Sequence, residues 1–280
     1  MTRPESASAV GGIVLAGGGS RRLGHDKASL DWHGTKLVER VARLLARGIG
    51  GGPIVVVGPH GEPDRFDLPK VNFESACDPV PDAGPLVGLL EGLHALEGRV
   101  ESAVVAACDL PLLHPVTVRT LAQRLASGDF DVAAPTDANE LLLPLPGAWR
   151  VSAAAQITAV IEDGGRSLRM AASRMKVLTL PLPSLAADQH VAQSDPQLRS
   201  LIDVDSATDL EELLSAPPRV RLARDGRILT PNAWTLGELA ATSGGDPEGP
   251  CVVNGLPIEF DPRFPLAERD AVAMPPAVDL

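Results

Sequence analysis

The sequence predicts an α/β fold with a doubly wound, mostly parallel sheet, followed by a small α+β domain. The first part of this prediction rests on short apolar runs that alternate regularly with amphipathic stretches of helical period. The second part rests on a change of pattern after Ala216-Pro217-Pro218, which is typical of a linker. We therefore expect a first domain at residues 10–215, a linker at residues 216–218 and a second domain at residues 219–280.

The elements of the first domain follow from hydrophobic periodicity. Short apolar runs predict strands, and the uniformly apolar run at residues 103–107 is typical of a central parallel strand covered on both faces. Apolar residues spaced three or four apart predict helices, with Gly84-Pro85 and Ser206 as start signals. The predicted strands are residues 12–14, 54–57, 103–107, 131–134, 177–180 and 201–204. The predicted helices are residues 37–45, 86–96, 116–126, 151–162 and 206–214.

The second domain is predicted to run in the order strand, strand, helix, strand, strand. Asp225-Gly226 is a strong hairpin signal between the first two strands. This order cannot continue the α/β alternation, so we expect a separate α+β domain. Its predicted elements are strands at residues 219–224, 227–230, 251–253 and 271–274 and a helix at residues 235–241.

Composition excludes several function classes. The chain of 280 residues has a formal net charge of −11, whereas a protein that binds nucleic acid needs a strongly positive face. No apolar run is long enough to cross a bilayer, and the N-terminal MTRPESASAVGG lacks the apolar core of a signal peptide. The three cysteines have no metal-ligand spacing and fit a reducing compartment. We therefore expect a cytoplasmic protein with no nucleic acid or membrane partner.

The stretch most informative about function is LAGGGSRRLGHDK at residues 15–27, directly after the first predicted strand. Three consecutive glycines let the backbone approach a ligand closely and turn its N–H groups towards anionic oxygens. Arg21, Arg22 and Lys27 add three cations, which suits a triphosphate. The pattern is neither a Walker loop nor a dinucleotide fingerprint. The alternative is a glycine-rich turn before a solvated basic helix end.

Two aspartates follow predicted strands, at the sheet edge where open α/β folds bind ligands. Asp109 follows the apolar run at residues 103–108 and precedes Leu110-Pro111, which turns the chain. A carboxylate there must be paired, solvated or bound to a metal, and Mg²⁺ favours carboxylates together with substrate phosphates. The alternative for Asp109 is a helix N-cap before residues 112–118. For Asp78 a plain turn aspartate is an equal alternative.

These motifs resemble the nucleotidyltransferases with the signature LAGG-x-S-x-R-[ML]-G-x-DK, and among them most closely the molybdenum cofactor guanylyltransferases. The resemblance covers about residues 11–215 and implies their Rossmann-like fold. Leu23 stands where that family usually has Met. The matching elements are LAGGGSRRLGHDK at residues 15–27, GPLVG at 84–88, ACDLP at 107–111, GRSLR at 165–169 and IDVD at 202–205.

The resemblance implies a set of site residues. Asp109 is implied to bind Mg²⁺, together with Asp203 or Asp205, and Arg22 and Lys27 to neutralise charge as pyrophosphate departs. Arg22, Lys27 and Asp109 are thus the implied catalytic residues. The implied nucleotide-binding residues are Leu15, Ala16, Gly17, Gly18, Gly19, Lys27, Asp78 and Asp109.

The reaction that the resemblance implies is attack by a phosphate oxygen of molybdopterin on the α-phosphorus of GTP. Transfer of this kind needs positioning and charge neutralisation more than a protein nucleophile. Alternatives are transfer of CMP, action on a sugar or another small phosphate, and a non-catalytic scaffold of molybdenum cofactor synthesis. Because the glycines, Arg22, Lys27 and Asp109 are all present, the sequence favours an active enzyme.

Two departures from the family pattern leave the nucleotide open. Asp203-Val-Asp205 stands where the family generally has Asn-x-Asn, and related molybdopterin cytidylyltransferases often carry Asp there. Gly58-Pro59-His60 replaces an Asn that usually follows the second strand, and we interpret His60 as a loop residue. The sequence therefore leaves GTP and CTP as alternatives.

The second domain resembles the β-grasp sulfur carriers of molybdopterin and thiamine synthesis. TLGELAATSGG at residues 235–245, VVNG at 252–255 and PLAERDAVAMPPA at 265–277 carry the resemblance, with Arg269 where Gly is usual. The carriers end in Gly-Gly, whereas this chain ends in Asp279-Leu280. We therefore expect a carrier-like module without carrier chemistry, which docks molybdopterin synthase or another cofactor-synthesis protein, or stabilises the transferase.

Overall fold

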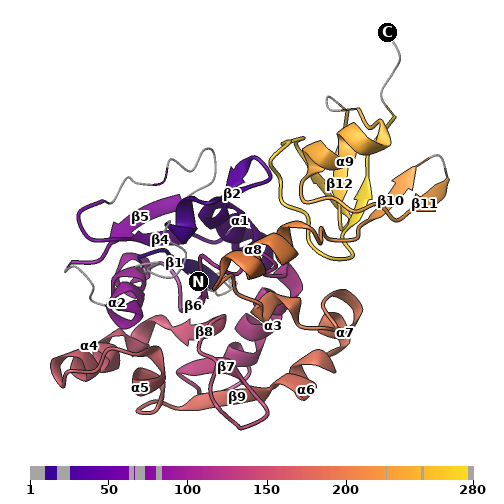
Figure 1. The fold of residues 1–280 in the computed structure, drawn as a ribbon. Coiled ribbons are helices and arrows are strands. Elements are labelled where there is room, and N and C mark those ends of the chain that lie inside the picture. The colour runs from indigo at the N-terminus through magenta and orange to yellow at the C-terminus, as the bar shows by residue number, and fades with distance from the viewer. Residues whose placement is uncertain are drawn as a thin grey trace, which may run out of the picture.

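The computed structural model describes residues 10–17, 26–62, 66, 73–79, 84–224, 226–246 and 249–276. Figure 1 shows a larger α/β part, which includes the N-terminal elements, and a smaller sheet near the C-terminus. No helix within these ranges is long and apolar enough to span a bilayer.

The large sheet has seven strands in the order β5-β4-β1-β6-β8-β7-β9. The pairs β5–β4, β4–β1, β1–β6 and β7–β9 are parallel, while β8 is antiparallel to both of its neighbours. The sheet is therefore mixed and mostly parallel, as the sequence predicts. Its strands are β1 (Val10–Leu15), β4 (Ile54–Gly58), β5 (Phe73–Cys77), β6 (Ser102–Ala107), β7 (Val132–Thr136), β8 (Gly147–Arg150) and β9 (Val177–Pro181).

Helices cover both faces of this sheet because its central strands are apolar on both sides. Val14 and Val56 point to one face, where α1 (Leu37–Ile49) and α3 (Pro115–Ala126) pack. Ile13 and Val55 point to the other, which α2 (Pro85–Leu96), α4 (Ala154–Glu162) and α5 (Leu168–Ala172) cover. The predicted start signals are confirmed: α2 begins at Pro85, and Ser206 caps α8 (Ala207–Leu214) in a capping box.

Several elements differ from the sequence-based expectation. The prediction of a strand at residues 201–204 is wrong: a 3₁₀ turn, η3 (Arg199–Leu201), is followed by a segment whose bond from Val204 N to Asp109 O belongs to no strand pairing. Residues 151–162 begin with the 3₁₀ turn η2 (Val151–Ala153) before α4. Strands β5 and β8 had no prediction, because β5 is an edge strand with partly exposed, polar residues and β8 is short. The further helices are α6 (Leu182–Ala186) and α7 (Gln189–Ser194).

The small sheet and its helix, here called the C-terminal unit (residues 219–276), has five strands in the order β11-β10-β14-β12-β13. The pair β10–β14 is parallel, and the pairs β11–β10, β14–β12 and β12–β13 are antiparallel. The predicted order lacked β13, which follows β12 through a tight turn at Asn254-Gly255, where both residues have positive φ. The elements are β10 (Arg221–Arg224), β11 (Arg227–Leu229), α9 (Leu236–Ser243), β12 (Cys251–Val253), β13 (Leu256–Ile258) and β14 (Ala271–Ala273).

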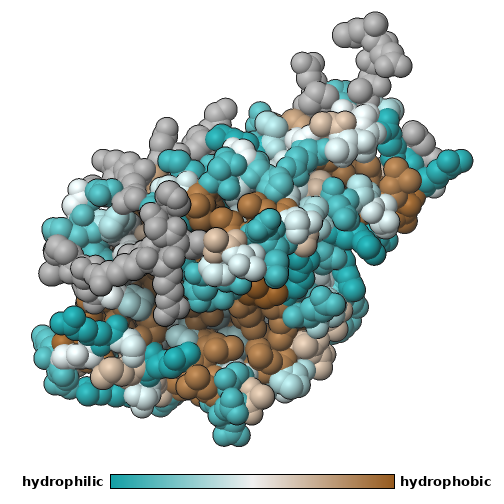
Figure 2. Space-filling view, viewed as in Figure 1, coloured by the Kyte–Doolittle hydropathy of each residue, from teal (hydrophilic) through white to brown (hydrophobic). Residues whose placement is uncertain are grey.

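One face of the small sheet forms a compact core with α9. Leu236 and Leu239 of the helix pack with Leu222 and Val272 of the central strands, and all four are buried. Ile228 at the β11 end is 62% exposed, and Figure 2 shows apolar side chains at that end of the unit. Asp225 of the predicted hairpin turn lies outside the described residues.

The two parts of the chain meet along α1 through three arginines, here called the arginine seam (Arg40, Arg43 and Arg47). Their spacing of three and four residues places them on one side of the helix. Arg43 pairs with Asp261 at 2.6 Å and Arg47 with Asp270 at 2.8 Å. Such pairs across an interface fix the register of the two surfaces.

Arg40 is the buried centre of this seam. It donates hydrogen bonds to the carbonyl oxygens of Pro111, Trp234 and Leu266, at 2.7, 3.1 and 2.8 Å. Burial lowers the pKa of Arg40 to about 9, which still leaves the guanidinium protonated at neutral pH. The guanidinium therefore satisfies three backbone acceptors, two of which belong to the C-terminal unit.

Candidate functional site

Four strands of the large sheet end at the same edge and bring the predicted site segments together. Leu15 of β1 pairs with Ala107 of β6 and with Val57 of β4, and Gly58 pairs with Cys77 of β5. The segments that follow contain Ala16-Gly17, Asp109 and Asp78. This is the edge where open α/β sheets bind their ligands, so the sequence-based placement of these residues is confirmed.

Lys27 lies between two carboxylates at this edge. Its Nζ is 3.1 Å from Asp109 Oδ2 and 2.8 Å from Asp205 Oδ1. Desolvation by burial acts to lower the pKa of Lys27, but the hydrogen bonds and charges of Asp205 and Asp109 outweigh it and raise the pKa. The side chain is therefore an ammonium group held in a fixed position with its charge largely retained.

The short turn that carries Lys27 is organised by its neighbour Asp26. Asp26 Oδ1 accepts from Ala28 N at 3.3 Å and Oδ2 accepts from Ser29 Oγ at 2.5 Å, which caps the 3₁₀ turn η1 (Lys27–Ser29). Sequence reasoning assigned no role to Asp26. The sequence does contain a signal for this role, because an aspartate is a typical N-cap residue of a helical turn.

Asp203 brings a third carboxylate near the same point. Burial raises the pKa of Asp203, and the charges of Asp205 and Asp109 act in the same direction. Three carboxylates around one ammonium leave a local excess of negative charge, which favours a further cation. Within the described ranges, however, no three or more His, Cys, Asp or Glu side chains form a ready metal-binding group.

The alternative interpretation of Asp109 as a helix cap is wrong. Helix α3 begins at Pro115, and its cap is His114, whose side chain accepts from Val116 N at 3.1 Å. Asp109 instead points to Lys27, on the preceding loop.

Asp78 is the second polar focus of the site. It follows β5, its backbone N donates to Gly58 O at 3.2 Å, and the residue is 6% exposed. The carboxyl lies between two glycines: a Cβ on Gly17 would be 2.9 Å from Oδ2, and one on Gly88 would be 3.2 Å from Oδ1. The sequence did not show this fit, because Gly17 and Gly88 belong to two different motifs and only the folded chain brings both of them to Asp78.

The Asp78 carboxyl is poorly compensated. Burial raises the pKa of Asp78 to about 6; the nearby charge of Glu91 acts in the same direction and His60 opposes both. Among the residues that the structure describes, Asp78 Oδ1 has no hydrogen-bond partner. His60 contacts the backbone of Asp78 and not its carboxyl group: His60 Nδ1 is 2.9 Å from the backbone oxygen of Asp78. A buried acceptor in this state is suited to a donor supplied by a ligand.

Some predicted site residues cannot be placed. Gly18, Gly19, Arg21 and Arg22 lie outside the described residues. Leu15 and Ala16 are described, and Ala16 N donates to Val57 O at 2.8 Å, which continues the sheet pairing to the start of the loop.

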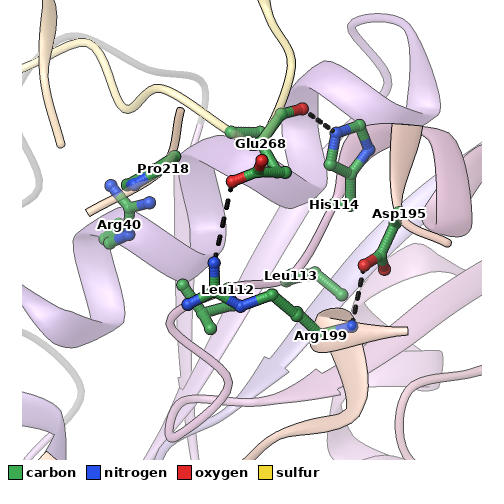
Figure 3. A pocket seen from close by; sticks show the side chains of 9 residues that line it. Arg40, Leu112, Leu113, His114, Asp195, Arg199, Pro218 and Glu268 are labelled. Atoms are coloured by element: carbon green, nitrogen blue, oxygen red, sulfur yellow. Dashed lines mark hydrogen bonds and ion pairs between the residues drawn. The ribbon is translucent and has the colours of Figure 1, made fainter. Parts of the chain in front are cut away.

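A separate small cavity lies between the α/β part and the C-terminal unit (Figure 3). Its volume of about 10 Å³ has room for roughly one water molecule, which excludes a substrate site. His114 and Arg199 both bond Glu268 of the C-terminal unit across it. The lining residues are Arg40, Leu112, Leu113, His114, Asp195, Arg199, Pro218, Ala267 and Glu268.

Residues 12–177 match the family described as the MobA-like NTP transferase domain. Over 203 residues the chain is 32% identical to a probable molybdenum cofactor guanylyltransferase of Chloroflexus aggregans, which covers 71% of this chain and 91% of that protein. It is 34% identical over 160 residues to a protein of the same description from Mycobacterium tuberculosis, covering 56% of this chain and 76% of that protein.

Solved structures show the same fold. A molybdopterin-guanine dinucleotide biosynthesis protein A from Archaeoglobus fulgidus superimposes with a TM-score of 0.59 at 23% identity and covers 74% of this chain and 97% of that one. A 4-diphosphocytidyl-2C-methyl-D-erythritol synthase from Anaerococcus prevotii does so with a TM-score of 0.52 at 11% identity, covering 74% and 96%. About a quarter of this chain therefore lies outside each of these two superpositions.

Proposed function

Because this chain belongs to the MobA-like NTP transferase family and is a nucleotidyltransferase, we propose that it transfers GMP from GTP to molybdopterin and releases pyrophosphate. The observation that carries the proposal is the position of Lys27 Nζ between Asp109 and Asp205, at the sheet edge where β1 and β6 end. This arrangement offers a fixed cation and two carboxylates at the edge where a triphosphate would lie.

In the proposed reaction a phosphate oxygen of molybdopterin attacks the α-phosphorus of GTP. The bond from the α-phosphorus to the bridging oxygen breaks, and pyrophosphate leaves with the electron pair. Lys27, with Arg22 from the same signature, neutralises the charge that develops on the leaving phosphates. The backbone at Gly17 lets the phosphates approach closely, and positioning supplies the rest of the rate enhancement.

The donor set at this edge fits Mg²⁺. Carboxylate oxygens of Asp109 and either Asp203 or Asp205 are hard ligands, and the local excess of negative charge favours a divalent cation. Bound there, Mg²⁺ would offset phosphate charge and help to fix the α-phosphate.

We assign base recognition to Asp78. An ionised carboxylate can accept from both N1–H and N2–H of guanine, whereas cytosine offers one exocyclic amino group. The buried, unpartnered Oδ1 supports this role because an incoming pair of donors would satisfy it. CTP stays a second candidate on account of Asp203-Val-Asp205, because related molybdopterin cytidylyltransferases often carry Asp at these positions.

We propose that the C-terminal unit is a β-grasp module without sulfur-carrier chemistry. Its strand order, with one parallel pair, two outer hairpins and one crossing helix, supports the resemblance seen in the sequence. Residues 277–280 lie outside the described part of the chain. Intact mass spectrometry of protein from producing cells tests the proposal, and a thiocarboxylate at Leu280 would contradict it.

The proposed reaction is tested by pyrophosphate release with each NTP in turn, with and without molybdopterin, in the presence of Mg²⁺. We expect release only with GTP and molybdopterin together, and we expect Asp109→Ala to abolish it while circular dichroism stays unchanged. Release of pyrophosphate with CTP would favour the second candidate, transfer of CMP from CTP. If no NTP releases pyrophosphate, with or without molybdopterin, the result would indicate a non-catalytic scaffold.

A further inference from the structure

Trp234 of the C-terminal unit lies under the segments that carry the proposed catalytic residues. It is 1% exposed and belongs to an apolar cluster in which every other member comes from the α/β part of the chain. We call this set the tryptophan cluster. Its buried members are Trp32, Leu37, Leu112, Val204, Leu213 and Trp234.

The first segment that rests on Trp234 is the hairpin after Lys27. Strands β2 (Asp31–Trp32) and β3 (Thr35–Lys36) form this hairpin, which Figure 1 shows beside the C-terminal unit. The rings of Trp32 and Trp234 meet edge to face with centroids 5.1 Å apart. Aromatic pairs of this geometry are attractive beyond the area that they bury.

His33, at the tip of the hairpin, adds a second contact to the C-terminal unit. Its ring contacts that of Trp234 in a tilted arrangement, with centroids 5.3 Å apart and an interplanar angle of 30°, and its Nδ1 is 2.6 Å from Glu238 Oε1. Glu238 Oε2 accepts from the backbone N of Trp234 at 2.7 Å. His33 has a φ of 53° and Gly34 a φ of 79°, so these two residues form the tight turn of the hairpin. The contacts of His33 join the tip of the hairpin to the C-terminal unit.

The other two site segments reach the same cluster. Val204 lies between Asp203 and Asp205, and its backbone N donates to Asp109 O at 3.0 Å. Leu112 follows Asp109 by three residues, and the Pro111 carbonyl between them accepts from Arg40, which also packs over the Trp234 ring at 4.7 Å. The three segments that carry Lys27, Asp109 and Asp205 are thus all packed against one side chain of the C-terminal unit or its direct neighbours.

We propose that Trp234 is a positioning residue for nucleotidyl transfer, through which the C-terminal unit holds the Lys27 turn in register with Asp109 and Asp205. The kinetic test of this inference rests on the proposed function, whereas the hydrogen-exchange test does not. It predicts that loss of the indole loosens these segments while the fold of the large sheet and the Asp78 side of the site stay unchanged.

The test compares Trp234→Ala and Trp234→Phe with the wild-type chain by hydrogen exchange. Val272→Ala is the matched control, because Val272 is buried in the core of the C-terminal unit away from the tryptophan cluster. We expect Trp234→Ala to speed exchange of the amides in residues 26–36 and 203–205 by about tenfold, the effect of losing one aromatic pair and one cation–π contact. Exchange in α2 and β4 is expected to stay unchanged, and Trp234→Phe and Val272→Ala are expected to have small effects.

The kinetic readout separates positioning from general stabilisation. Trp234→Ala is expected to lower kcat about tenfold and leave the KM for GTP within about twofold, because Lys27 acts on the transition state while Asp78 is untouched. Trp234→Phe should rescue most of this loss. If Trp234→Ala does not fold, the same measurements are made on His33→Asn. This variant removes the His33 ring that contacts Trp234, while Asn tolerates the positive φ.

Unchanged exchange of residues 26–36 in Trp234→Ala or His33→Asn would overturn the inference. So would equal effects of Trp234→Ala and Val272→Ala, which would reduce Trp234 to an ordinary core residue. If the wild-type chain transfers no nucleotide, the proposed function fails, and the exchange measurement still decides the positioning role by itself.

Discussion

Replacing Asp78 by asparagine is expected to stabilise the fold and to impair nucleotide binding at the same time. The carboxyl is buried between the backbones of Gly17 and Gly88, and its pKa is raised from 3.8 to about 6. Each tenfold change in proton affinity corresponds to about 1.4 kcal/mol, so the ionised carboxyl destabilises the folded state by at most about 3 kcal/mol. Because the amide must also be desolvated, we expect a net gain of about 1–2 kcal/mol in the free energy of unfolding.

The sign of the pH dependence follows from the raised pKa. Well below pH 4 the carboxyl is protonated in both the folded and the unfolded chain, so wild type and Asp78→Asn differ little. Between about pH 4 and pH 6 the unfolded carboxyl ionises before the folded one, and the wild type loses stability relative to the variant. Above about pH 6 the difference is constant.

Urea denaturation of both chains near pH 4 and near pH 7.5 measures this difference. A variant that is less stable than the wild type near pH 7.5 would contradict the prediction, because it would mean that the carboxylate has a stabilising partner. A stability difference that does not change with pH would contradict it as well. Isothermal titration with GTP completes the test: we expect about 10- to 100-fold weaker binding, the loss of a charge-assisted pair of hydrogen bonds, with binding of inorganic triphosphate unchanged.

Three further predictions concern single residues. Arg40→Met leaves three carbonyl oxygens without their donor, and we expect the free energy of unfolding, measured in urea, to fall by about 3–5 kcal/mol; a fall below about 1 kcal/mol would mean that water replaces the guanidinium. Gly17→Ala places a Cβ 2.9 Å from Asp78 Oδ2, so the KM for GTP is expected to rise about tenfold or more, and an unchanged KM would argue against the close approach at that loop. Asp205→Asn removes one carboxylate from Lys27, and because the Asp205 side chain is 54% exposed we expect a smaller loss of kcat than for Asp109→Asn; equal losses would place both aspartates in the same role.

The sequence predicted the central strands and the edge where the site lies, because those features depend on local periodicity. The run at residues 103–107 is apolar at every position, and only a strand buried on both faces requires that. The placement of Asp109 follows from the same run. Strand β5 was not predicted because an edge strand needs no apolar pattern. Residues 201–204 were mistaken for a strand because Leu201, which is half-buried, and Val204, which is buried, pack into two different apolar clusters.

Two parts of the site depend on contacts between distant segments, which periodicity does not encode. The burial of Asp78 requires Gly17 and Gly88 to meet it from two other elements. The role of α1 was also hidden, because the sequence analysis assigned nothing to its three arginines, which form the interface with the C-terminal unit. Charged residues at helical spacing can thus mark an interface as well as a surface.

The contacts of the arginine seam join residues that are far apart along the chain. The carbonyl partners of Arg40 lie 71, 194 and 226 residues away along the chain, so α1 leaves the ribosome long before the last two of them. During that interval an apolar interface of the same extent would be exposed and prone to aggregation. A guanidinium group can instead be hydrated until the C-terminal unit supplies its carbonyl partners.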